Sequence, residues 1–360
     1  MVIDVIKIFL PLTVSFFLGI ALTPILTHYL YKKEMWKKQA KTVAIDGRGT
    51  PIFNQLHKDK EVGTPKMGGV VIWLSATLTM LFIWLAAKFF PSDLTHKLDF
   101  MSRDQTWLPL MALLVGAFVG LIDDYMDISG IKSWKAGGLS LKKRLAVVAA
   151  VGLFAALWFY IKLDVTSVTL PFFSGDVEIG WLFVPFFVFV TLALYSGGII
   201  DGLDGLAGGI FSIIFSAYAG IAFYQHQLNL AAFCAVIVGG LLAFLWFNIP
   251  PARFYMSETG SMALTLALAI VAFMTDSLGE GRGIAVLPII ALPLILTTLS
   301  IIVQLVSKKF RNGKKIFLVA PIHHHFEALG WPAYKVTMRY WIIGFICAVI
   351  GLTAAMIGKF

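Results

Sequence analysis

Long apolar stretches alternate with short polar segments along the whole chain. Each apolar stretch approaches the roughly 20 residues that an α-helix needs to cross a bilayer. The expected spans are 8–30, 69–90, 107–122, 145–161, 181–200, 210–225, 230–250, 262–275, 284–306 and 340–357. The pattern therefore predicts an all-α polytopic integral membrane protein of about ten transmembrane helices, with one transmembrane domain over residues 1–360.

Three local features refine this expectation. The first span has no small-residue cleavage motif, so we read it as a retained span and not as a cleaved signal peptide. Cys234 and Cys347 fall inside predicted spans and are expected to be small buried apolar residues. Segment 164–180 contains two β-prone runs around a Ser-Gly-Asp turn, a pattern typical of a small hairpin, which would lie on the periplasmic side.

Composition and charge support the membrane assignment. Hydrophobic residues make up 59% of the chain and charged residues only 14%, against about 25% charged residues in soluble domains. The net charge of +9 would suit a nucleic-acid-binding protein, but most of the 29 lysines and arginines lie in loops after odd-numbered spans. Basic loops stay cytoplasmic, so we expect both termini outside, no nucleic-acid partner, and a cytoplasmic face that attracts phosphorylated substrates.

Five carboxylates lie at the predicted cytoplasmic ends of three spans. Asp123 and Asp124 follow the third span, Asp201 and Asp204 occur in "DGLDG", and Glu258 occurs in "SETGS". Mg²⁺ is usually held by one or two carboxylates together with substrate phosphates. The alternatives are a carboxylate pair that marks the membrane boundary, an ordinary polar turn, and a helix cap. We expect one Mg²⁺-dependent active site from the cytoplasmic loops 31–68, 123–144, 200–209, 251–261 and 307–339.

Basic side chains on the same face are candidates for binding phosphate. Lys60, Lys66 and Arg144 belong to loops that the charge pattern places on the cytoplasmic side. The alternative for each of them is simple anchoring at the membrane surface, which explains many lysines and arginines beside membrane spans.

The segment "APIHHHFEALGW" places three histidines in one short loop between the last two spans. Adjacent side chains point in different directions, which disfavours a single zinc ion bound by His323, His324 and His325 together. Imidazoles can instead donate hydrogen bonds to phosphate or orient a leaving group. A purely structural role is the remaining alternative.

The motifs "TPKMGG", "DDY", "DGLDGLA", "ETGS" and "APIHHHFE" occur in the order and loop placement of the polyprenyl-phosphate N-acetylhexosamine-1-phosphate transferases. The chain resembles this family over nearly its whole length, and its histidine segment is similar to the branch that transfers phospho-N-acetylmuramoyl-pentapeptide. The resemblance implies transfer from UDP-MurNAc-pentapeptide to undecaprenyl phosphate, giving lipid I and UMP. It also implies Mg²⁺ dependence, a homodimer and the bacterial cytoplasmic (inner) membrane.

The resemblance also implies roles for individual residues. Asp123 and Asp124 match paired active-site aspartates, and Glu258 matches a metal-binding aspartate. We expect Glu258 and Asp123 to hold the metal. With the paired aspartates and Glu258, the three histidines complete the expected catalytic set. The residues expected to bind substrate are Asp204 and Asn248 in the nucleotide pocket, Tyr255 stacked on uracil, and Lys60, Lys66, Arg144 and Asp201.

Four positions depart from the family pattern. Glu258 stands where the family has aspartate, and Gly198 stands where it has asparagine. Asp127 replaces the lysine of "DDY-x-K", and Lys66 replaces the threonine of "TPTMGG". We expect Lys66 to restore part of the positive charge that is lost at position 127, in an active enzyme.

Three other functions fit parts of the pattern. A sister enzyme would use a UDP-N-acetylhexosamine without the peptide, and a panel of donors would distinguish it. Ion-coupled transporters carry ionisable residues near the middle of the membrane, whereas the span interiors here are almost free of charge. A non-catalytic membrane scaffold would release no UMP from any donor.

Overall fold

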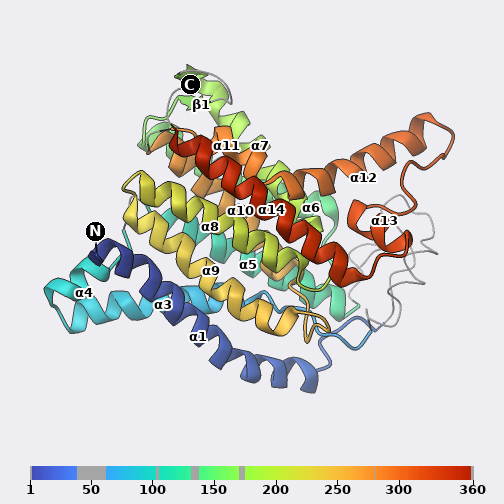
Figure 1. Ribbon diagram of the computed structural model, residues 1–360, viewed down its shortest axis with the longest axis horizontal. Helices are drawn as coiled ribbons and strands as arrows, with labels where there is room; N and C mark the ends of the chain where they lie inside the picture. The colour runs from blue at the N-terminus through green and yellow to red at the C-terminus, as the bar shows by residue number, and fades with distance from the viewer. Residues whose placement is uncertain are drawn as a thin grey trace.

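The computed structural model describes residues 2–38, 62–102, 105–130, 138–169, 175–279 and 281–357. Ten helices within these ranges are long and apolar enough to cross a membrane, which confirms the expected fold class. They are α1 (Val2–Lys32), α3 (Val70–Phe89), α5 (Trp107–Ile128), α6 (Leu141–Lys162), α7 (Phe183–Gly197, extended by 3-10 turns on both sides to Gly180–Ile200), α8 (Leu206–Tyr224), α9 (Leu228–Asn248), α10 (Ser257–Ser277), α12 (Leu292–Phe310) and α14 (Ala333–Met356). Figure 1 shows them packed as one bundle.

Helix α10 is the centre of the bundle. Its apolar stretch is 94% buried, against 17% for the peripheral helix α1. Two glycines of α5 let it approach α10 closely: a Cβ at Gly120 would lie 2.3 Å from the carbonyl oxygen of Glu258, and one at Gly116 would lie 2.8 Å from Cα of Ala263. Small residues at such contacts let membrane helices pack backbone against backbone.

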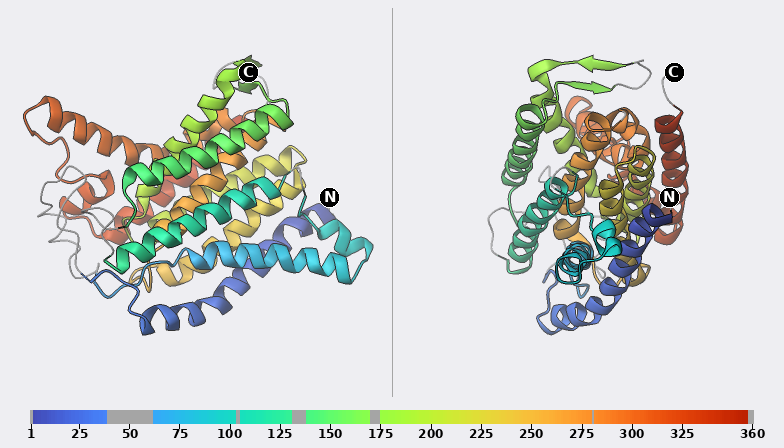
Figure 2. Two further views of the ribbon diagram at one scale, coloured as in Figure 1. Left: turned by 180° about the vertical axis from the view of Figure 1, so that it is seen from behind. Right: turned by 90° about the vertical axis from the view of Figure 1, so that its left-hand side faces the viewer.

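The expected span 284–306 is not one helix. The chain forms α11 (Gly283–Ile290), breaks at Ala291, and continues as α12. Pro288 and Pro293 flank the break, and proline lacks the N–H group that an uninterrupted helix requires. After the break α12 runs away from the other helices, as Figures 1 and 2 show.

The short elements lie at the two ends of the bundle. They are α4 (Asp93–Leu98), β1 (Ser167–Thr169), β2 (Asp176–Glu178), η1 (Gly180–Leu182), η2 (Gly198–Ile200) and α13 (Ile322–Ala328). Strands β1 and β2 pair antiparallel, with Val168 opposite Val177. The hairpin predicted in segment 164–180 is therefore confirmed.

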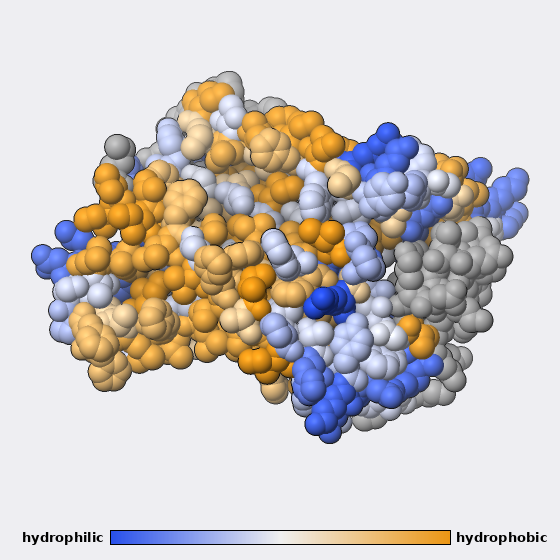
Figure 3. Space-filling model, turned by 60° about the horizontal axis from the view of Figure 1, so that its bottom comes forward, coloured by the Kyte–Doolittle hydropathy of each residue, from blue (hydrophilic) through white to orange (hydrophobic). Residues whose placement is uncertain are grey.

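The polar and apolar surfaces are separated along the bundle. Figure 3 shows a broad apolar band, with hydrophilic residues concentrated beyond it, mainly at the end where α1 finishes. Helix α1 begins and α14 finishes at the opposite end from α13 (Figure 1). The bundle thus has two distinct ends, and the acidic and histidine motifs lie at one of them.

Candidate active site

The paired aspartates lie on the last turns of α5. We expected them at the start of a loop, but the helix continues to Ile128. Asp124 is fully buried, and its Oδ2 accepts hydrogen bonds from the Thr259 backbone N–H at 3.0 Å and from the Thr259 hydroxyl at 2.7 Å. Thr259 belongs to the first turn of α10, where backbone N–H groups lack partners within the helix. Such a helix start attracts anions, and here a carboxylate of the chain itself occupies it.

Lys66 supplies the positive charge beside Asp124. Its Nζ lies 3.2 Å from Oδ1 of Asp124 and 2.6 Å from Oδ2 of Asp127. Burial alone would lower the pKa of Lys66, but the two carboxylates outweigh burial and hold that pKa above its ordinary value. The lysine that departs from the family pattern thus pairs with the aspartate that also departs from it.

A second cation joins Asp123 to Glu258. Nη1 of Arg144, at the start of α6, hydrogen-bonds Oε1 of Glu258 and lies 3.8 Å from Oδ2 of Asp123. The other oxygen of Asp123 accepts a hydrogen bond of 2.6 Å from the Leu139 N–H. The Tyr195 hydroxyl lies 3.4 Å from Oε2 of Glu258. Three helices therefore bring two acidic groups onto one guanidinium nitrogen.

The "DGLDG" loop contacts the start of α10. Asp201 Oδ2 accepts a 2.7 Å hydrogen bond from the Ser257 N–H, and Asp204 Oδ2 accepts one of 3.2 Å from the Ala252 N–H. Burial raises the pKa of Asp201 to about 6, although the Ser257 N–H opposes the shift. Both aspartates are thus within the same assembly as Glu258.

Asn248 and Tyr255 support the loops around the site. The Asn248 amide accepts from the Gly205 N–H at 2.9 Å and donates to the Phe254 carbonyl at 2.8 Å. The backbone of Tyr255 pairs with Pro65 and Gly68 on the segment before α3. Contact of either side chain with a nucleotide stays a prediction.

The histidine segment forms the short helix α13, and its members separate. His323 and His324 are buried against the "DGLDG" loop, where a Cβ at Gly202 would lie 2.4 Å from Nε2 of His323 and 3.0 Å from Nε2 of His324. Nδ1 of His324 lies 2.7 Å from Oε2 of Glu327. His325 instead accepts a 3.2 Å hydrogen bond from the Leu318 N–H. Two of the three imidazoles therefore join the acidic site, and the third supports the preceding loop.

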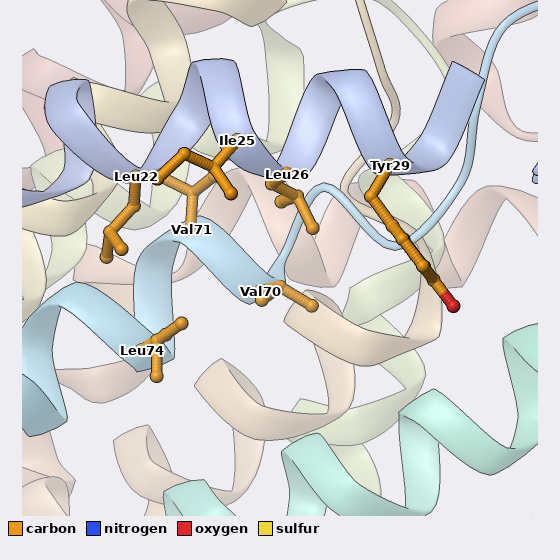
Figure 4. A pocket seen from close by; sticks show the side chains of 7 residues that line it. All are labelled: Leu22, Ile25, Leu26, Tyr29, Val70, Val71 and Leu74. Carbon is orange, nitrogen blue, oxygen red and sulfur yellow. The ribbon is translucent and has the colours of Figure 1, made fainter. Parts of the chain in front are cut away.

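The remaining candidate, Lys60, lies outside the described residues. A groove of about 300 Å³ opens between α1 and α3 (Figure 4), and it is lined by Leu22, Ile25, Leu26, Tyr29, Val70, Val71 and Leu74. Among the described residues, those that line this groove are apolar except for the hydroxyl of Tyr29.

The carboxylates of the site fit a Mg²⁺ ion that is held by the protein and by substrate phosphates together. Within the described residues there is no group of three or more carboxylate, imidazole or thiol ligands arranged for a metal. However, carboxylate oxygens of Asp123 and Glu258 already converge on one cationic atom of Arg144. Two carboxylates completed by phosphate oxygens are the usual protein ligands of Mg²⁺.

Sequence reasoning missed three residues of the assembly. Tyr195 reaches Glu258 from α7, Leu139 donates its N–H to Asp123, and Gly202 provides the surface for two histidines. For Gly202 a signal existed, because glycine allows close backbone approach. A tyrosine at the end of an apolar span and a backbone N–H of a leucine gave none.

Comparisons with known proteins identify the family of the chain. Residues 106–276, from the start of α5 to the end of α10, match glycosyl transferase family 4. A phospho-N-acetylmuramoyl-pentapeptide-transferase of Listeria monocytogenes is 34% identical over 295 residues, covering 82% of this chain and 85% of the relative. Its counterpart in Bacillus anthracis is 33% identical over 345 residues, covering 94% and 95%. That of Chloroflexus aurantiacus is 32% identical over 335 residues.

The ten-helix bundle is thus that of a membrane-embedded glycosyl transferase of family 4. Within that class, the similarity to these relatives extends over most of both chains. The chain belongs to the phospho-N-acetylmuramoyl-pentapeptide transferase family.

Proposed function

We propose that this chain transfers phospho-N-acetylmuramoyl-pentapeptide from its UDP conjugate to undecaprenyl phosphate, producing lipid I and UMP. The observation that carries the proposal is the convergence of the paired aspartates of α5, Glu258 of α10 and the imidazoles of α13 at one end of the membrane-spanning bundle. A lipid phosphate at the bilayer surface and a soluble nucleotide can meet only at such an end.

The proposed transfer exchanges one phosphorus–oxygen bond for another. An oxygen of the acceptor phosphate bonds to the phosphorus that carries the sugar, and the bond from that phosphorus to UMP breaks. Asp123 or Asp124 either accepts a proton from the acceptor phosphate, or attacks the same phosphorus first and expels UMP, after which the acceptor oxygen displaces the aspartate. Asp123 is the better placed, because its Oδ2 has only Arg144 nearby, at 3.8 Å, whereas Asp124 accepts hydrogen bonds on both oxygens, from Thr259 and Lys66.

Asp123 and Glu258 would hold Mg²⁺, which supplies positive charge to the diphosphate and to the departing UMP. Arg144 orients both carboxylates before substrate binds. The carboxylate of Glu327 fixes the ring of His324, which would then face the substrate from the "DGLDG" side.

We further propose that the site faces the cytoplasm of a bacterial inner membrane, with both termini outside. The support is the concentration of basic residues at the predicted cytoplasmic face and the position of the helix ends in Figure 1. Single cysteines introduced at the N-terminal end of α1 and next to α13 test this orientation. In intact cells, an impermeant thiol reagent should modify the first cysteine and leave the second unmodified. The homodimer stays a prediction. The molar mass of the purified protein, after subtraction of the bound detergent, tests it.

A donor panel tests the reaction. Purified protein with undecaprenyl phosphate and Mg²⁺ should release UMP from UDP-MurNAc-pentapeptide, and EDTA should stop the release until Mg²⁺ is added back. Preferential release from UDP-N-acetylglucosamine would point to the sister activity, and release with neither donor would contradict the proposal.

A further inference from the structure

The segment that carries Lys66 is fixed at its backbone from two sides. The Lys66 N–H donates to the carbonyl of Met35 at 2.9 Å. The Tyr255 N–H donates to the carbonyl of Pro65 at 2.9 Å, and the Gly68 N–H donates back to the carbonyl of Tyr255 at 2.8 Å. The α-carbon of Lys66 is therefore held at a set place beside the start of α10.

The side chain of Lys66 is fixed as well. A lysine is normally a flexible, hydrated point charge, but here the side chain is only 17% exposed and its ammonium bridges Asp127 at 2.6 Å and Asp124 at 3.2 Å. The shorter bond goes to Asp127, which is 12% exposed. Asp127 therefore acts as the anchor of the ammonium, and Asp124 is the group that receives it.

Asp124 needs this second contact to have one orientation. Thr259 engages only Oδ2, and the terminal torsion of an aspartate side chain is broad. We propose that Lys66 is a positioning residue, held in place by Asp127, that fixes Oδ1 of Asp124 and thereby aligns the paired aspartates with the start of α10. This inference rests on the role of the paired aspartates in the proposed transfer, and it replaces our expectation that Lys66 binds substrate.

Steady-state kinetics of Lys66→Met test the inference. With the full-length protein in detergent, UDP-MurNAc-pentapeptide, undecaprenyl phosphate and Mg²⁺, kcat for UMP release should fall on the order of 10- to 100-fold, the effect of losing a charged hydrogen bond. KM for the donor should change less than about threefold, because positioning acts on the transition state and not on ground-state binding. Lys66→Arg, which keeps the charge and the donors, should recover most of kcat.

The chain offers a matched control lysine. Nζ of Lys37 lies 3.7 Å from the same oxygen of Asp127, with its side chain 20% exposed. Lys37→Met removes one positive charge from the same cluster but no bond to Asp124, so kcat should stay within about twofold of wild type. Asp127→Asn should lower kcat by several-fold, and should have no further effect in the Lys66→Met background.

Three outcomes would overturn the inference. A donor KM raised tenfold or more with kcat intact would make Lys66 a phosphate-binding residue. An equal loss in Lys37→Met would reduce the effect to net charge, and wild-type kcat in both Lys66→Met and Asp127→Asn would remove any role. If Lys66→Met does not fold, the kinetics of Asp127→Asn replace it as the test. A lower kcat with little change in the donor KM supports the inference, and a higher KM with unchanged kcat contradicts it. Failure of the proposed reaction itself would look different, since wild type would then release no UMP.

Discussion

Helix α10 has a buried carboxylate at each end, and the two are held in nearly the same way. At the N-terminal end, Asp124 accepts from the N–H and the hydroxyl of Thr259. At the C-terminal end, Asp276 accepts from the N–H of Thr169, at 3.1 Å, and from its hydroxyl. The third donor differs: it is the ammonium of Lys66 for Asp124 and the backbone N–H of Ile284, at 3.1 Å, for Asp276.

The charge of that third donor distinguishes the two ends of α10: it is positive at Asp124, which we place in the active site, and neutral at Asp276, which holds the fold together. A backbone N–H is neutral and cannot leave, so Asp276 joins the β-hairpin and α11 to α10 permanently. The ammonium of Lys66 instead brings a compensating positive charge to Asp124, and the guanidinium of Arg144 does the same for Glu258. The end of α10 that carries Asp124 and Glu258 is therefore the end suited to anionic substrates.

The largest effect is expected at the N-terminal end. Asp124→Asn removes the negative charge of the carboxylate to which Lys66 and Thr259 donate hydrogen bonds. UMP release should then fall on the order of 10³-fold or more. Release is measured from UDP-MurNAc-pentapeptide in detergent with Mg²⁺. Full activity would rule out the paired-aspartate mechanism and would make the two ends of α10 equivalent.

Gly202→Ala tests the contact between the "DGLDG" loop and the histidines. The added Cβ would lie 2.4 Å from Nε2 of His323, so the ring must move. We expect a loss of roughly 100-fold in kcat, the size associated with displacement of a catalytic group by about 1 Å. Gly198→Ala is the control, because its Cβ would come no nearer than 3.3 Å to Ser261 and 3.9 Å to Thr265, and the loss should be no more than about threefold.

Asp276→Asn should affect stability and not the reaction. The amide NH₂ cannot accept the hydrogen bonds that Thr169 and Ile284 donate to the carboxylate. We expect a loss of about 1–3 kcal/mol in the free energy of unfolding, seen as a lower Tm in detergent. Activity per folded molecule at low temperature should be unchanged; a selective loss of kcat would show that this end of α10 also serves catalysis.

The smallest effect concerns pH. The pKa of Asp201 is about 6 in the folded protein, above its ordinary value of 3.8, so the folded state binds the proton more tightly than the unfolded state. The free energy of unfolding from this group should fall as pH rises from about 4 to 6 and then stay level. The difference in Tm between wild type and Asp201→Asn should change over that interval. A constant difference from pH 4 to 7 would contradict the shift.

The sequence predicts the helices well because burial in a bilayer requires long apolar runs, and each run can be read locally. It failed at Ala291, where Pro288 and Pro293 were the available signal but the run stayed apolar throughout. It also ended the third span at 122, because the charges of Asp123 and Asp124 interrupt the apolar pattern although the helix continues.

For the site, the sequence supplied the residue types and the common face but not the pairs. Which cation meets which carboxylate depends on how α5, α6 and α10 cross, and Arg144 and Glu258 are 114 positions apart. The separation of His325 from His323 and His324 follows from the local helix of α13. The contact of Asp124 with the start of α10 could not be foreseen, because Asp124 and Thr259 lie 135 positions apart.

The contact between Lys66 and Asp127 has a consequence for hybrid proteins. The two residues lie 61 positions apart, and both differ from the motifs that the resemblance in sequence implies, "TPTMGG" and "DDY-x-K". A chimera whose junction falls between them would combine threonine with aspartate, or lysine with lysine, next to Asp124. Either hybrid would have the wrong charge at that point, so these two positions should be inherited, or engineered, together.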